Sequence, residues 1–243
     1  MTLTLQNLTK RYKDKLALDD VSLTLEPGIW GLLGPNGAGK STMMNIIAGI
    51  LTQTGGQALW NGKPVAESGA AYRAILGFQP QSPGLYDAFT ARQYLRYMCV
   101  LKGVFQKKGE KRALEEHIAQ TLESVNLTAD ADRRAGTFSG GMKHRLGVAQ
   151  ALLGRPELVI LDEPTSGLDP QERVRLRKMI AALAENKIIL WSTHIVSDIE
   201  SVAHQVILLR KGRCVFAGKP GGDGLEKLYL QYFDSPEEGG GPV

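Results

Sequence analysis

Cysteine is scarce in this sequence: only Cys99 and Cys214 occur among 243 residues, and neither has a Cys or His neighbour at the spacing of metal ligands. We therefore expect neither a disulfide framework nor a zinc site, and a reducing compartment suits the chain. Aromatic residues make up only 7%, whereas the apolar fraction of 43% is that of an ordinary globular protein. A chain of this length can bury the core of one large α/β domain, with or without an inserted subdomain.

Long apolar runs are also missing. No stretch approaches the roughly 18–20 apolar residues that span a bilayer. Residues 1–10 alternate apolar and polar side chains, which is typical of a half-buried strand and not of a signal peptide. We therefore expect a cytoplasmic protein whose membrane role, if it has one, depends on a partner.

The net charge of +4 and the pI near 9.0 permit contact with nucleic acid or an anionic lipid surface. The densest basic run lies at 107–112, but Glu110, Glu115 and Glu116 interleave with it. This pattern is typical of an exposed helix with salt bridges. We therefore expect no nucleic-acid contact.

The hydrophobic pattern divides the chain into alternating elements. It predicts strands at 1–10, 21–25, 29–33, 57–60, 74–78, 157–161, 187–192, 205–210 and 213–217. It predicts helices near 43–47, in two stretches between 90 and 125, and at 141–153, 171–184, 195–202 and 224–232. Turns are expected at Pro27-Gly28, Asn61-Gly62 and Lys211-Gly212.

This order of elements predicts an α/β fold with a mostly parallel sheet, an N-terminal antiparallel β subdomain and an inserted helical subdomain. We expect one domain over 1–232 and a flexible tail at 233–243. Within the domain, the core would take 1–88 and 150–232, and the helical subdomain would take about 89–149. Ligands of such a sheet bind at the carboxyl ends of its parallel strands.

One glycine-rich segment, 34–41, has the P-loop pattern and lies between a predicted buried strand and a predicted helix. Its glycines let the backbone curl so that consecutive amides point at a phosphate. Lys40 would neutralise the β- and γ-phosphate oxygens, and the Ser41 hydroxyl would ligate Mg²⁺. The predicted ATP-binding residues of this loop are Gly34, Pro35, Asn36, Gly37, Ala38, Gly39, Lys40, Ser41 and Thr42.

Polar side chains follow two other predicted strands. The strand at 157–161 is followed by Asp162 and Glu163. In a chain without a P-loop, such a pair would usually lie in a solvated turn or cap a helix. Beside a P-loop, Asp162 is expected to hold Mg²⁺ through water, and Glu163 to polarise the attacking water as a general base. His194 follows the strand at 187–192 and is a candidate orienter of the γ-phosphate.

The segment from Phe138 to Met142, with Ser139, Gly140 and Gly141 between them, resembles the signature motif of the ATP-binding cassette (ABC) family. The usual sequence of that motif is Leu-Ser-Gly-Gly-Gln, so Phe138 and Met142 differ from it at the first and fifth positions. Ser139 and the two glycine amides would cap a helix and form a second anion site. The motifs occur in the family's order over essentially the whole chain, and the resemblance implies a P-loop NTPase (RecA-like) core that binds and hydrolyses Mg-ATP.

The resemblance also implies roles for other residues. Tyr12 matches the aromatic residue on which adenine stacks. Gln81 matches the glutamine that contacts Mg²⁺ and links the core to the helical insert, and Gln79 is the alternative. The loop that ends at Asp169 resembles the one that crosses the dimer partner.

In this family two cassettes face each other, each ATP lying between one P-loop and the other cassette's signature. The implied unit is a dimer, either of two copies or with a related cassette. Segments 84–87 and 94–97 resemble bacterial export-type cassettes, which act through a separate integral membrane subunit at the inner face of the membrane. We expect that subunit to bind in a groove near Gln81, Leu85, Tyr86 and Tyr94.

Three rival functions have less support in the sequence. A soluble ABC protein that acts on ribosomes or nucleic acid is supported only by the positive charge, and the usual second cassette or coiled-coil insertion is missing. A P-loop GTPase would need a guanine-reading Asn-Lys-x-Asp motif. A small-molecule kinase would need an arginine-rich lid. The sequence contains neither of these signals.

Overall fold

The structure, a computed structural model, describes residues 1–82, 84–105, 107, 109–222 and 224–233. The strands are β1 (Leu3–Tyr12), β2 (Lys15–Leu25), β3 (Gly28–Leu33), β4 (Gly55–Trp60), β5 (Lys63–Pro64), β6 (Leu76–Gln79), β7 (Leu158–Asp162), β8 (Ile188–Thr193), β9 (Gln205–Arg210) and β10 (Arg213–Gly218). The α-helices are α1 (Lys40–Ile47), α2 (Gly69–Ile75), α3 (Ala91–Lys102), α4 (Lys111–Ser124), α5 (Gly140–Leu152), α6 (Pro170–Ala182), α7 (Val196–Ile199) and α8 (Leu225–Phe233). Single 3-10 turns are formed by Val65–Glu67, Thr128–Asp130 and Ala135–Thr137.

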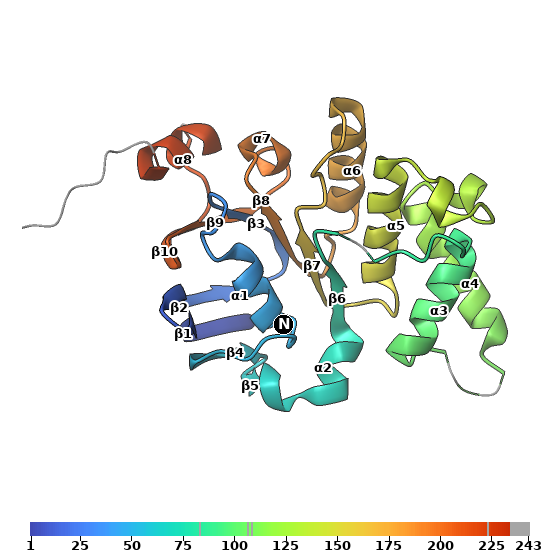
Figure 1. The fold of residues 1–243 in the computed structure, drawn as a ribbon, viewed down its shortest axis with the longest axis horizontal. Coiled ribbons are helices and arrows are strands. Elements are labelled where there is room, and N and C mark those ends of the chain that lie inside the picture. The colour runs from blue at the N-terminus through green and yellow to red at the C-terminus, as the bar shows by residue number, and fades with distance from the viewer. Residues whose placement is uncertain (83, 106, 108, 223, 234–243) are drawn as a thin grey trace, which may run out of the picture.

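Two sheets organise the chain (Figure 1). The larger has the order β10-β9-β3-β8-β7-β6, in which every pair is parallel except β10 with β9. The smaller, β2-β1-β4-β5, is antiparallel. The predicted α/β fold with a parallel sheet and an N-terminal antiparallel sheet is therefore confirmed.

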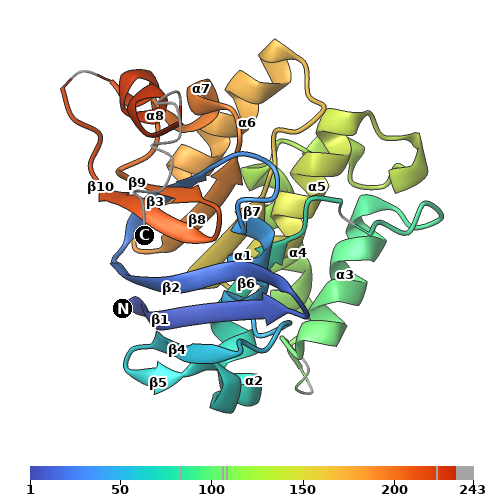
Figure 2. The same ribbon diagram turned by 60° about the vertical axis from the view of Figure 1, so that its left-hand side comes forward.

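The large sheet is buried on both faces because its strands alternate between two apolar clusters. Leu158 and Ile160 of β7 face the cluster that also holds α1 and the small sheet. Val159 and Leu161 face the cluster that holds α3 to α8. Burial on both faces explains why β3, β7 and β8 read as continuous apolar runs. Figure 2 shows the small sheet on one side and α6 to α8 on the other.

The predicted strand at 74–78 is partly wrong. Ala74 and Ile75 end the helix α2, and the strand β6 begins at Leu76. The helix is short and lies against the small sheet, with Tyr72 buried and its hydroxyl donating to the carbonyl of Ile47 at 2.7 Å. A seven-residue helix with one buried side chain carries too little periodicity to be recognised in a sequence.

The two helices predicted between 90 and 125 are α3 and α4. Thr90 and Gln93 make a capping box at the start of α3. On the exposed sides, Arg96 pairs with Glu115 at 2.8 Å and Arg112 pairs with Glu116 at 2.7 Å, as predicted for a salt-bridged surface; Lys108 of the basic run lies outside the described residues.

The buried residues of α3 and α4 belong to the same apolar cluster as the sheet, and α5 runs through the boundary predicted at position 149. The division at 89–149 stays a prediction. The predicted tail at 233–243 lies, except for residue 233, outside the described residues. In the described part of the chain no helix is long and apolar enough to cross a bilayer.

Candidate nucleotide-binding site

The glycine-rich loop joins β3 to α1 and needs its glycines for physical reasons. A Cβ on Gly34 would lie 2.3 Å from the carbonyl oxygen of Leu209. A Cβ on Gly39 would lie 2.5 Å from the carbonyl oxygen of Ala17, and its φ of 107° is in the left-handed region. The loop therefore packs against neighbouring backbone where no side chain fits, and it curls directly into the N-terminus of α1.

Lys40 is the first residue of α1, and its ammonium group turns back into the loop. Its Nζ donates to the carbonyls of Gly34 at 2.6 Å and Pro35 at 3.2 Å. Burial lowers the pKa of Lys40, and the nearby carboxylates of Glu163 and Asp162 act in the opposite direction. A partly desolvated cation held by neutral carbonyls is well suited to receive an anionic ligand.

The two carboxylates at the end of β7 are held differently. Asp162 is buried, and the Ser192 hydroxyl of β8 donates to its Oδ1 at 2.6 Å. The amide of Glu163 donates to the Oγ and the carbonyl of Ser192 at 3.0 and 3.2 Å. Glu163 has a φ of 47°, which is uncommon for a residue with a side chain and adds local strain. The strand end therefore holds Asp162 in the sheet and turns the chain sharply at Glu163.

The carboxylate of Glu163, at the end of β7, contacts side chains that follow the two neighbouring strands β6 and β8. Gln81, two residues beyond β6, donates from Nε2 to Oε2 at 3.3 Å. His194, directly after β8, places Nδ1 3.1 Å from Oε1. The predicted trio of Gln81, Glu163 and His194 is thus brought together at one sheet edge.

The alternative glutamine, Gln79, lies elsewhere. It pairs with Leu161 in the sheet and is fully buried, and its side-chain amide has no hydrogen-bond partner among the described residues. Of the two glutamines, Gln81 is the one that contacts the Glu163 carboxylate, and its role toward Mg²⁺ stays a prediction.

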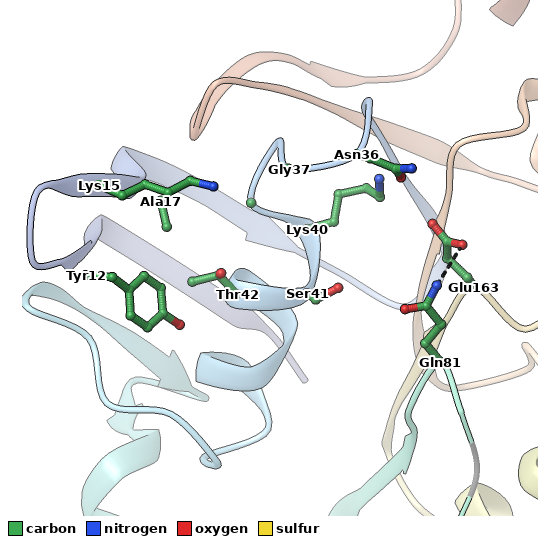
Figure 3. Close-up of a pocket in the computed structure, with 11 residues that line it drawn as sticks. Tyr12, Lys15, Ala17, Asn36, Gly37, Lys40, Ser41, Thr42, Gln81 and Glu163 are labelled. Atoms are coloured by element: carbon green, nitrogen blue, oxygen red, sulfur yellow. Dashed lines mark hydrogen bonds between the residues drawn. The ribbon is translucent and has the colours of Figure 1, made fainter.

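A cavity of about 440 Å³ runs along the P-loop. It is lined by Tyr12, Lys15, Ala17, Asn36, Gly37, Gly39, Lys40, Ser41, Thr42, Gln81 and Glu163. In Figure 3, Tyr12 and Lys15 lie at one end, Gln81 and Glu163 at the other, and Lys40 between them. The volume falls in the range of small-molecule sites, and the arrangement suits a ligand with an aromatic head and an anionic tail.

Two lining residues, Lys15 and Ala17, were missed by the sequence analysis. Both lie at the start of β2, directly after the turn that follows Tyr12. The β1–β2 hairpin places them beside Tyr12, whose register partner is Lys15. Recognition of the hairpin, which pairs residues on either side of 13–14, would have revealed them.

No cluster of three or more His, Cys, Asp or Glu side chains forms a metal site within the described residues. The predicted Mg²⁺ set of Ser41, Gln81 and Asp162 comes instead from three segments, of which the first two line the cavity. Such an oxygen set is incomplete alone and fits a Mg²⁺ ion whose shell is completed by phosphate oxygens and water.

The signature segment lies apart from this cavity, since none of the described residues that line it belongs to 138–142. Ser139 caps α5 by accepting a hydrogen bond from the amide of Met142 at 3.2 Å. Ser139 and Gly140 are exposed, whereas Gly141 is buried, and a Cβ there would lie 2.7 Å from Oε2 of Glu172. The capped helix end is thus open to a second molecule.

The two positions that depart from the usual signature point inward. Phe138 is buried, and the guanidinium of Arg133 lies 5.8 Å from its ring centroid. Met142 packs against the same apolar cluster. The departures therefore change the packing beneath the segment and leave its exposed serine and glycine unchanged.

The loop after Glu163 ends at Asp169, which is exposed and caps α6 by accepting from the amide of Glu172 at 2.9 Å. Two of the other three histidines have hydrogen-bond partners, whereas the buried Nδ1 of His144 has none among the described residues. His117 accepts from the amide of Gly154 at 3.1 Å, and His204 accepts from the amide of Ile29 at 3.0 Å.

Comparisons with known proteins identify relatives of this chain. Residues 18–166 match the family described as ABC transporter. The chain is 38% identical over 218 residues to an uncharacterized ABC transporter ATP-binding protein, YxlF, of Bacillus subtilis, covering 89% of this chain and 70% of the relative. It is also 38% identical to the Nod factor export ATP-binding protein I of Burkholderia thailandensis, covering 88% of this chain and 70% of that protein.

Solved structures give the same result. A dimeric ATP-binding cassette in a post-hydrolysis state bound to ADP and Pi has a TM-score of 0.80 at 25% identity, over 90% of this chain and 99% of the other. The cbiO1 protein of Clostridium perfringens, part of the ABC transporter complex cbiONQ, has a TM-score of 0.82 at 25% identity, over 95% and 91%. From its motifs, its fold and these relatives, this chain belongs to the ATP-binding proteins of the ABC transporter family.

Proposed function

We propose that the chain binds Mg-ATP along its P-loop, hydrolyses it, and thereby drives a transporter whose membrane-spanning part is a separate subunit. The observation that carries the proposal is the contact of the Glu163 carboxylate with Gln81 and His194, at the end of the cavity opposite Tyr12. A carboxylate with two polar orienting groups beside a phosphate loop is the arrangement that hydrolysis needs.

The two ends of the cavity would bind different parts of the nucleotide. Tyr12, with 44% of its surface exposed, would stack on the adenine. The amides of the loop and Lys40 would bind the phosphates. Ser41 and Gln81 would ligate Mg²⁺, and Asp162 would hold it through water. When bound, Mg²⁺ would screen the charge of the phosphate oxygens.

Glu163 would act as the general base. Its carboxylate would accept the proton of the attacking water, while Gln81 and His194 hold the carboxylate and the water in line with the γ-phosphate.

A second cassette is part of the proposal. Ser139 and Gly140 lie at an exposed helix N-terminus that does not line its own chain's cavity, so they would contact the nucleotide of a partner cassette. The dimeric cassette among the solved relatives supports this arrangement. Asp169, exposed at the end of the loop after Glu163, would cross toward that partner.

The membrane subunit would bind at a groove between the core and the helical insert, which keeps the chain at the inner face of the membrane. A hollow of about 480 Å³ lies there, with Ile50, Phe78 and Met98 among its apolar lining residues. None of the residues predicted for the groove lines this hollow. Among those residues, Tyr86 is 49% exposed and contacts the rings of Phe89, Tyr94 and Tyr97. An exposed apolar and aromatic surface of this kind is typical of a protein interface.

Export is the proposed direction, because relatives include proteins named for Nod factor export and for probable multidrug transport.

The membrane partner and the activity are tested by purifying the chain from membranes in mild detergent and measuring ATP hydrolysis. We expect an integral membrane protein to co-purify. Recovery with ribosomes or nucleic acid would favour the soluble alternative.

Charge placed in the groove should separate the partner from the chain. Tyr86→Asp should lose the membrane subunit, since burying an unpaired carboxylate in an apolar interface is costly. Leu230→Asp, an equally exposed apolar residue on α8, is the matched control. Co-purification is the measurement and thermal unfolding checks the fold. A Tyr86→Asp protein that keeps its partner would exclude this groove.

A further inference from the structure

A buried carboxylate outside the nucleotide cavity connects two of the loops that form the site. Asp198 lies on the short helix α7, four residues after His194, and is 1% exposed. The hydroxyl of Thr165, itself 1% exposed, donates to its Oδ2 at 2.6 Å. Thr165 comes two residues after Glu163. One short hydrogen bond therefore joins the segment that follows the proposed base to the segment that follows His194.

The same carboxylate makes longer contacts on both sides. Thr193, directly before His194, directs its hydroxyl to Oδ2 at 3.5 Å. On α6, Arg173 lies 3.8 Å from Oδ1, and its Nε donates to the carbonyl of Leu168 at 3.0 Å. Leu168 directly precedes Asp169. Arg173 therefore connects the Asp198 carboxylate to the loop proposed to cross to the partner cassette.

The helix α6 contacts α7 at one more point, where Arg177 donates from Nη1 to the carbonyl of Ser197. All these partners belong to the segments 163–177 and 193–198, which leave neighbouring parallel strands. The two segments are far apart in the chain, and side-chain contacts are what hold them together beyond the strand ends.

Burying the Asp198 carboxylate costs desolvation free energy, so stability alone does not explain why it is there. Desolvating a carboxylate is repaid only when its oxygens are well partnered, and a packed apolar set is often as stable or more so. What a short, buried, charge-assisted hydrogen bond adds is a defined geometry between the groups that it joins. Here those groups flank Glu163 and His194, whose side chains stand 3.1 Å apart.

We propose that Asp198 is a positioning residue for hydrolysis: through Thr165 and Arg173 it ties the loop after Glu163 to the loop that carries His194. The proposal rests on the proposed function, because it assumes that Glu163 and His194 act on the γ-phosphate. Loss of the tie leaves the P-loop and Tyr12 untouched. Nucleotide affinity therefore stays, while His194 and Asp169 lose their fixed relation to Glu163.

The test uses the purified full chain and compares Thr165→Val with Asp198→Ala. The valine is nearly the same shape as threonine and removes only the donor to Asp198, so it keeps the test valid if Asp198→Ala fails to fold. Thr121→Val is the matched control, since Thr121 is also a buried threonine, on α4, and donates to the carbonyl of His117 at 2.8 Å.

Steady-state hydrolysis and nucleotide binding are measured for each variant. We expect Thr165→Val to lower kcat by about 10-fold or more, the scale of a misplaced catalytic geometry, with nucleotide Kd changed by less than about 2-fold. Thr121→Val should change neither quantity. Wild-type kcat in both Thr165→Val and a folded Asp198→Ala would overturn the proposal.

A second measurement separates positioning from general loosening. If the tie works through His194, adding Thr165→Val to a His194→Ala protein should cost less than about 2-fold in kcat, because contacts on one path are not additive. An unchanged 10-fold cost in that background would overturn the proposal.

Hydrogen exchange keeps this inference distinct from the proposed function. Thr165→Val should raise amide exchange in both 163–169 and 193–199, because the tie holds both loops. A wild-type chain that hydrolyses no ATP would refute the proposed function alone. In that case, faster exchange in both loops would still support the tie, and faster exchange in 163–169 alone would overturn it.

Discussion

Replacing Glu163 by Gln is the sharpest perturbation that the site allows. The side chain is 10% exposed and is held at its two oxygens by Gln81 and His194. Glutamine has the same shape and can keep a contact at each end, so the fold and the cavity should persist. What is lost is the ability to take a proton from water.

The expected loss follows from that single change. A positioned general base contributes about 10²–10⁴-fold in rate, which is roughly 3–5 kcal/mol of barrier. Nucleotide binding depends on the P-loop and on Lys40 and should not weaken. Removing a negative charge beside the phosphates favours the bound state further. Glu163→Gln should therefore accumulate as a nucleotide-bound dimer that the wild-type protein forms only transiently.

Phosphate release measures the rate, and size-exclusion chromatography with light scattering, with and without Mg-ATP, measures the dimer. Glu157→Gln is the matched control, because Glu157 directly precedes β7 at the opposite end from Glu163 and does not line the cavity. Its activity should equal that of the wild type. A Glu163→Gln protein that hydrolyses ATP near the wild-type rate would refute the assignment of the base. An inactive variant that stays monomeric would contradict only the homodimer.

Three further outcomes are expected. Lys40→Ala should lose most ATP affinity in an equilibrium titration while keeping its far-ultraviolet circular dichroism, because the loop loses its principal cation. A mixture of Ser139→Arg and Lys40→Ala chains should hydrolyse more ATP than either alone, since one complete site forms per mixed dimer; no gain despite mixed dimers would argue against composite sites. Tyr72→Phe should lower the free energy of unfolding in urea by about 1–3 kcal/mol, because the buried carbonyl of Ile47 loses its donor.

Several parts of the fold were predictable because the signal is local. The strands β3, β7 and β8 consist mainly of apolar residues; β7 ends at Asp162 and β8 at Thr193, and Gly34 follows β3. A run of that kind between turn residues indicates a strand buried on both faces. The helix α2 escaped prediction because its seven residues bury only Tyr72.

The candidate site was predictable to a different extent at each residue. The P-loop pattern is contained in eight consecutive residues. Lys40 and Ser41 could therefore be identified from the sequence without tertiary information. Lys15 needed knowledge of the β1–β2 register, in which it pairs with Tyr12. The tie between Thr165 and Asp198 was not foreseen, because neither residue belongs to a pattern and they are 33 positions apart.

Local patterns in the sequence were enough to predict most of the strands, the glycine-rich turn and the residue types at the strand ends, because these depend on contacts within a few residues. The meeting of Gln81, Glu163 and His194 depends on tertiary structure, since it requires the strand order β8-β7-β6. Tertiary structure also decided that the Ser139 helix end lies away from its own P-loop. Strand order and helix placement come from burying both faces of one sheet at once, a condition on the whole chain that no local pattern contains.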